Sequence, residues 1–169
     1  AAGRFHRQRA GIEGEIAAIA ARHAKKADLV AMRKTVDRMR DFATDFTKRD
    51  AADREFHVRL AAASGNGSLP LIVQGMWQQR RGKLWSRIET YFHTQKMRDG
   101  ALLDHTKIID ALEQRDADAA RDAMHKHISR VEREFQRQWD VIVPQQGAGN
   151  GARRATPLRK RSTSTQSIS

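Results

Sequence analysis

The chain has 169 residues, of which 39% are hydrophobic and 31% are charged, and it contains no cysteine. This length and composition suit one globular domain with a modest core. The lack of cysteine excludes disulfide frameworks, thiolate metal sites and cysteine nucleophiles, and since there is no signal peptide and no apolar run of about 18 residues, we expect a cytoplasmic protein with no membrane span.

The net charge of +12 is unevenly distributed along the chain. Residues 145–169 contain five basic residues and no acidic one, and they are rich in Gly, Ser and Thr. This composition, without apolar periodicity, is typical of a disordered segment. We therefore expect a helical domain over residues 1–143 and a disordered basic tail over residues 144–169.

Regularly spaced apolar residues predict the first two helices. Positions three or four apart in the first segment form one stripe, which consists of Phe5, Arg9, Ile12, Ile16, Ile19 and His23. After a break at Lys25 and Lys26, a second stripe runs from Leu29 to Phe46. Both stripes predict amphipathic helices with one buried face.

The third and fourth helices are bounded by turn residues. The third is predicted to begin at Asp50 and to end at Gly65, because glycine is favoured just past the last turn of a helix. The fourth begins next to Pro70, which suits a first helical turn, and continues to Phe92.

The last two helices follow a turn predicted at Asp99 and Gly100. A short helix spans residues 105–112, and Asp116 caps a final helix that ends before Pro144. Helices joined by short loops predict an all-α protein, an antiparallel bundle of six or seven helices.

Four residues of metal-ligand type occupy positions where packing favours an apolar side chain: Asp53, His57, His105 and His127. Asp53 and His57 are four residues apart, so on a helix they lie one above the other and can grip the same ion. Three imidazoles and a carboxylate suit Zn²⁺, Ni²⁺, Mn²⁺ or Fe²⁺. Taken singly, the pair is also compatible with a surface hydrogen bond, and each of the other histidines with a hydrogen-bonded core residue.

The motifs around these residues resemble those of a known family. Residues 53–61 (DREFHVRLA) and 64–66 (SGN), then 105–112 (HTKIIDAL) and 124–128 (MHKHI), follow the order and spacing of the FCD domain. That domain is the effector-binding half of FadR-type GntR transcription regulators. The resemblance extends over residues 9–136.

The resemblance implies a divalent transition metal, Zn²⁺ first and Ni²⁺, Mn²⁺ or Fe²⁺ as alternatives, at positions matching Asp53, His57, His105 and His127. It also implies a pocket above the metal for a small carboxylate effector, pairing into a homodimer, and DNA binding through a winged helix-turn-helix that is missing from this chain. Asn66 matches an Asn of the family and is predicted to bind the effector, with a role in the turn as the alternative.

Two arginines are added to the effector-binding set from the residues themselves. Arg9 and Arg80 each interrupt an apolar stripe, and a guanidinium can hold a carboxylate through two hydrogen bonds. The alternative for both is an arginine whose stem packs at a helix edge while its charge reaches water.

These observations favour a metal-dependent sensing domain of a DNA-binding transcription regulator over an enzyme. A metal-dependent hydrolase is one alternative, but Glu55, the acid next to the predicted ligands, points away from them on a helix. The other alternative is a basic nucleic-acid-binding helical module that uses the positive charge directly.

Overall fold

The computed structural model describes residues 2–79 and 94–142. This part of the chain forms helices and no strand, as predicted: α1 (Ala2–His23), α2 (Lys26–Asp41), α3 (Phe46–Ala63), α4 (Ser68–Gln78), α6 (Gln95–Glu113) and α7 (Ala117–Ile142). The predicted continuation of the fourth helix to Phe92, and the predicted tail, lie outside the described residues. None of the described helices is long and apolar enough to cross a lipid bilayer.

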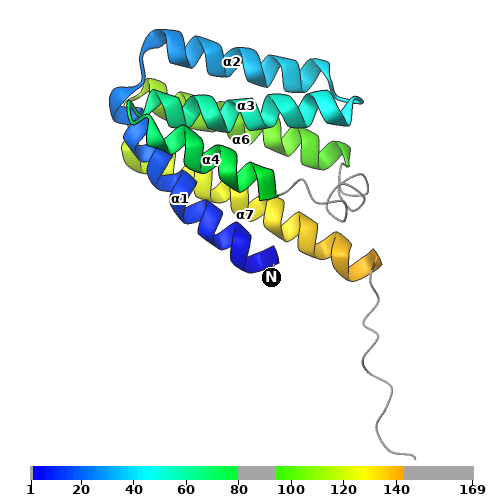
Figure 1. Cartoon of the computed structure of the whole chain (residues 1–169). Helices are drawn as coiled ribbons and strands as arrows, with labels where there is room; N and C mark the ends of the chain where they lie inside the picture. The colour runs from blue at the N-terminus through cyan, green and yellow to red at the C-terminus, as the bar shows by residue number, and fades with distance from the viewer. Residues whose placement is uncertain (1, 80–93, 143–169) are drawn as a thin grey trace, which may run out of the picture.

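Helices α3 and α6 lie in the middle of the bundle (Figure 1). Helix α3 contacts α1, α2 and α4, while α6 contacts α1, α2 and α7. Helices α1 and α7 lie side by side and run in opposite directions. The core takes side chains from every described helix, and its largest fully buried apolar members are Phe56, Met32, Leu60, Ile108, Ile109, Leu112, Met124 and Ile128.

Small residues are buried along α1, and one of them, Gly14, lies close to α7. Ala17 and Ala21 are completely buried, and a Cβ placed on Gly14 would lie only 2.2 Å from Nε2 of His125 on α7. The predicted stripe is wrong here, because Ile12 is 42% exposed and His23 is exposed as well. The glycine leaves room for His125 of α7, while the large Ile12 side chain lies on the exposed side of α1.

Three predicted helix boundaries are also wrong. The second helix ends at Asp41 and not at Phe46, and the third begins at Phe46 and not at Asp50, because the side chain of Asp45 accepts a hydrogen bond from Lys48 N at 3.0 Å. Helix α6 begins at Gln95, after Thr94 at its N-cap, and so runs through the turn predicted at Asp99 and Gly100.

The predicted cap at Asp116 is confirmed, since its Oδ1 accepts a hydrogen bond from Ala119 N at 2.9 Å. A cap at this position fixes where α7 begins, and thereby which of its residues face the bundle interior.

Candidate metal centre

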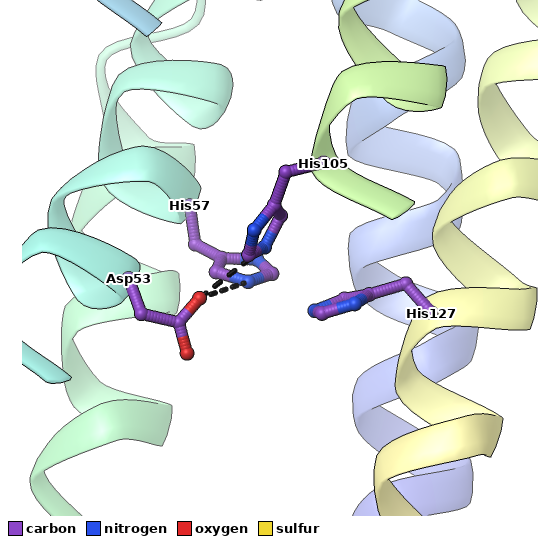
Figure 2. Close-up of side chains that lie close together, drawn as sticks. All are labelled: Asp53, His57, His105 and His127. Atoms are coloured by element: carbon purple, nitrogen blue, oxygen red, sulfur yellow. Dashed lines mark ion pairs between the residues drawn. The ribbon is translucent and has the colours of Figure 1, made fainter. Parts of the chain in front are cut away.

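The four predicted ligand residues come together in the middle of the bundle. Asp53 and His57 lie on α3, His105 on α6 and His127 on α7, and Figure 2 shows the four side chains pointing toward one another. One donor atom from each residue lies within 4.8 Å of the donor atoms of the other three. The three imidazoles are buried, and the Asp53 side chain is 28% exposed.

The donor atoms are close to one another, and two of them lack a hydrogen-bond partner. Oδ1 of Asp53 lies 3.2 Å from Nε2 of His105 and 3.5 Å from Nε2 of His57. Nevertheless, neither Asp53 Oδ1 nor His105 Nε2 has a hydrogen-bond partner. Buried polar atoms without partners are costly in a folded protein. Their convergence fits a set of ligands for a cation better than the hydrogen-bonded surface pair or core histidines that the sequence also allowed.

The electrostatics of the cluster suit metal ligation. Burial lowers the pKa of His105, and burial together with the nearby His105 lowers the pKa of His127 to about 3. Both imidazoles are therefore neutral at pH 7, as a metal ligand must be. Burial opposes the charge of Asp53, but the imidazoles of His105 and His57 outweigh this effect and hold the pKa of the carboxyl well below its usual range.

Helix α1 reaches the cluster through Glu13, which is buried. No sequence pattern indicated a role for this residue. Nδ1 of His57 is hydrogen-bonded to Oε2 of Glu13, and the other oxygen of Glu13 accepts from Nε of Arg9. Burial favours the neutral acid, but Arg9 and His57 outweigh it and lower the pKa of Glu13 to about 2. On His57, burial acts to lower the pKa, but the charge of Glu13 and the contacts of the ring with Asp53 and Glu13 together outweigh burial and raise it.

Arg9, predicted to bind the effector, lies beside the cluster. Its guanidinium lies over the ring of Trp77 from α4, at 4.8 Å from the ring centroid, and its Nη2 is 3.5 Å from Nε2 of His57. The alternative of an arginine that snorkels at a helix edge does not hold, because Arg9 is only 3% exposed.

Asp104 is a second carboxylate that approaches a candidate ligand, His127, from outside the cluster. Its Oδ2 accepts a hydrogen bond from Nε of Arg130 at 2.7 Å and lies 3.4 Å from Nδ1 of His127. This placement leaves Nε2 of His127 for the cluster. No sequence pattern indicated this role of Asp104. The residue precedes the candidate ligand His105 on α6, whereas its side chain contacts His127 and Arg130 on α7.

A cavity of about 180 Å³ opens beside the cluster, with Asp53 and His127 in its wall. The rest of its lining combines apolar side chains with acidic and basic ones: Met39, Arg40, Ala43, Arg49, Asp50, Gln95, Met97, Arg98, Asp99, Ala101, Leu102 and Val131. A cation held by the four ligands would therefore face a partly apolar space that also contains guanidinium groups. No sequence pattern indicated Arg40, Arg49 and Arg98, because each lies on a different helix and none interrupts an apolar stripe.

The two remaining predicted residues are placed differently. Arg80 lies outside the described residues. Asn66 is exposed in the turn between α3 and α4, where its Oδ1 accepts from Ser68 N at 3.0 Å and its own N–H donates to Ser64 Oγ at 3.2 Å. These contacts match the turn role that was the alternative, and effector binding by Asn66 stays a prediction.

The family of the chain follows from a direct comparison. Residues 5–130 match the family model of the FCD domain. The chain belongs to the FCD domain family. This match covers all four candidate ligands, and it confirms the resemblance inferred from the motifs.

Curated relatives of this FCD domain are transcription regulators. The Uxu operon regulator of Haemophilus influenzae is 27% identical over 121 residues, which are 71% of this chain and 46% of the relative. The Uxu operon transcriptional regulator and the Exu regulon transcriptional regulator of Escherichia coli are each 31% identical, over 71% and 69% of this chain and 48% and 45% of their own lengths. The chain thus spans about half the length of these relatives, and none of their names denotes an enzyme.

Solved structures agree with this assignment. The Streptococcus agalactiae GntR structure aligns with a TM-score of 0.60 and 28% identity, over 78% of this chain and 58% of that one. The E. coli McbR/YncC structure aligns with a TM-score of 0.71, over 81% of this chain and 65% of that one. At 14% identity, this alignment shows a shared fold and nothing about function.

Proposed function

We propose that this FCD domain is the metal-dependent, small-organic-acid-sensing domain of a GntR transcription regulator of the FadR type. The observation that carries the proposal is the convergence of one carboxylate and three imidazoles beside a cavity of about 180 Å³. The regulator would act in the cytoplasm and bind DNA through a separate winged helix-turn-helix domain.

The donor set indicates the metal. Three imidazole nitrogens and one carboxylate oxygen match Zn²⁺ best, and Ni²⁺, Mn²⁺ and Fe²⁺ also accept these ligands. When bound, the metal supplies a Lewis acid that attracts a carboxylate in a partly apolar cavity. The chain's own residues would hold it. Burial keeps His105 and His127 neutral, Glu13 orients His57, and Asp53 supplies the negative charge.

The effector is proposed to be a small carboxylate. Arg40, Arg49 and Arg98 in the cavity wall suit an anion, while the apolar lining suits a short carbon skeleton. Arg9 is also proposed to contact the effector, although its Nε is paired with Glu13 and Arg9 does not line this cavity. Sensing requires that the acid bind two packings of the bundle with different affinity, since only that difference shifts their populations.

The domain is further proposed to form a homodimer. Leu71 and Ile72 on α4 are 67% and 45% exposed, and large apolar side chains gathered on one helix favour a protein contact. A second copy of the chain is the proposed partner, because a two-fold contact uses the same face on both copies and needs no second surface.

Native mass spectrometry of the untreated protein tests these statements together. We expect one divalent transition metal per chain, a co-purified small acid, and a mass of two copies of the 19.2 kDa chain. His127→Ala should lose the metal and the acid together, because it removes a ligand from the wall of the cavity. His23→Ala, at an exposed position, is the matched control. Wild-type protein without stoichiometric metal, after incubation with each candidate ion, would contradict the proposal.

The hydrolase alternative loses its candidate base. Glu55 is ion-paired with Arg38 at 2.6 Å and with Arg59 at 2.8 Å, on the side of α3 that faces away from the cluster. The sequence-based expectation that Glu55 points away from the ligands is thereby met. Turnover of an ester or phosphate panel by the metal-loaded chain would reopen this alternative.

A further inference from the structure

Helix α1 contains none of the four candidate ligands, yet it contacts one of them from behind. Glu13 is hydrogen-bonded to Nδ1 of His57, and the two side chains are 1% and 0% exposed. Since that contact uses Nδ1, the nitrogen that remains to face Asp53 is Nε2. The contact therefore determines both the orientation of the ring and the nitrogen that carries the proton.

Glu13 is itself held in place from two sides. One oxygen contacts His57 and the other accepts from Nε of Arg9, whose guanidinium lies over the Trp77 ring. Rotation of the Glu13 side chain would leave Arg9 buried without its carboxylate, which is strongly unfavourable. The chain from Trp77 to His57 is thus a fixed buried network between α4, α1 and α3.

His105 provides the internal contrast. Its Nδ1 is buried and has no hydrogen-bond partner among the described residues. The orientation of His105 therefore depends on packing, notably against Phe56, whose ring centroid lies 4.3 Å from that of His105. His57 is oriented instead by a charged hydrogen bond from another helix.

We propose that Glu13 is a positioning residue of the metal centre, which fixes the ring of His57 and thereby couples the packing of α1 to metal affinity. The inference rests on the proposed function, because it requires that the four residues bind a metal. A carboxylate that accepts Nδ1–H orients the imidazole and makes Nε2 a stronger ligand. By thermodynamic reciprocity, a metal bound at Nε2 strengthens the attachment of α1 to α3.

The first test measures the Zn²⁺ affinity of the full 169-residue chain by competition with a chromophoric chelator. Loss of such a partner typically weakens metal binding by about 10–100-fold. We expect the loss of affinity in Glu13→Gln to lie near the lower end of this range, because an amide oxygen still accepts Nδ1–H without the charge. The loss in Glu13→Ala should lie near the upper end. Glu15→Gln is the matched control, since Glu15 is on the same helix, 61% exposed, and paired with Arg121.

The second test separates positioning from a general effect on folding. The visible absorption of bound Co²⁺ reports the geometry of its ligands, so Glu13→Gln should change that spectrum whereas Glu15→Gln should not. In a His57→Ala background, Glu13→Gln should have no further effect on affinity, because its action passes through His57.

A backup variant covers the case in which Glu13→Ala fails to fold because Arg9 is left unpaired. Arg9→Met combined with Glu13→Gln removes both buried charges at similar volume, and it should still show the weakened affinity and the altered Co²⁺ spectrum. Wild-type affinity and spectrum in Glu13→Gln would overturn the role of Glu13 and leave the metal centre standing. Failure of the wild-type chain to bind metal would instead overturn the proposed function and this inference with it.

Discussion

At the scale of single residues, Glu13 shows how a buried carboxylate remains ionised. Burial works against its charge, but Arg9 and His57 outweigh burial and lower its pKa from 4.5 to about 2. A carboxyl group whose pKa falls on folding stabilises the native state at pH values above its unfolded pKa. That contribution is lost as pH falls through the folded pKa.

We therefore expect the free energy of unfolding to decrease as the pH is lowered from about 4.5 toward about 2, the two pKa values of Glu13. Glu13→Gln should flatten this dependence, because glutamine has no proton to bind. Urea unfolding in the presence of a chelator, at a series of pH values, measures the effect. Glu15→Gln controls for an exposed acid of the same helix, and identical pH dependence in wild type and Glu13→Gln would contradict the expectation.

The four residues of the candidate centre could be predicted from sequence, whereas the carboxylates that contact them from behind could not. Asp53, His57, His105 and His127 stand out because polar side chains occupy positions on apolar stripes. By contrast, the contact of Glu13 with a residue 44 positions away depends on how two helices pack, and no local pattern records it.

At the scale of helices, the contact between α1 and α7 depends on one missing side chain. A Cβ on Gly14 would lie 2.2 Å from Nε2 and 2.3 Å from Cδ2 of His125, well inside van der Waals contact. By comparison, a Cβ on Gly11, in the same helix, would meet nothing within 4 Å. The two glycines therefore allow a matched comparison.

Gly14→Ala should leave the protein about 1–3 kcal/mol less stable than Gly11→Ala, because overpacking against His125 opposes the gain in helix propensity that both alanines bring. Gly11→Ala should stabilise it by about 0.5–1 kcal/mol, because alanine is the better helix former. Urea unfolding of both variants gives the two values. His125→Ala should restore stability to Gly14→Ala if the clash is the cause, and equal stability of the two alanine variants would show that it is not.

The all-α bundle could be predicted from sequence, but not all its helix boundaries. Apolar spacing and capping residues such as Asp116 indicate helices whatever their neighbours. The start of α6 was predicted wrongly, because Asp99 followed by Gly100 is typical of a turn. In the structure both residues are helical, since Thr94 caps the helix and Gly100 lies against Arg130 of α7. The exposed Ile12 was misplaced because the buried residues of α1 are largely alanines, which a stripe of large apolar side chains does not mark.

At the scale of the whole molecule, the candidate centre joins α3, α6 and α7 at a single point. A ligand that binds only the folded state stabilises it by about 2.7 kcal/mol when present at 100 times its dissociation constant. We expect Zn²⁺ to raise the melting temperature by several degrees and a strong chelator to reverse the change. Differential scanning calorimetry measures both shifts.

His127→Ala is the decisive variant for this thermal effect. It should show no shift with Zn²⁺, since α7 then contributes no ligand, whereas the exposed variant His23→Ala should respond like the wild type. A full Zn²⁺ response in His127→Ala would mean that the ion acts elsewhere on the protein.

The distribution of the four candidate ligands along the chain would also affect how the domain acquires a metal during biosynthesis. During translation, Asp53 and His57 leave the ribosome first, His105 follows, and His127 emerges last. A nascent chain therefore cannot bring the four candidate ligands together until α7 has been synthesised as far as His127 and has docked. Metal acquisition would consequently mark the completion of folding, and truncated translation products would be unable to compete for the cell's free metal with the same affinity as the finished domain.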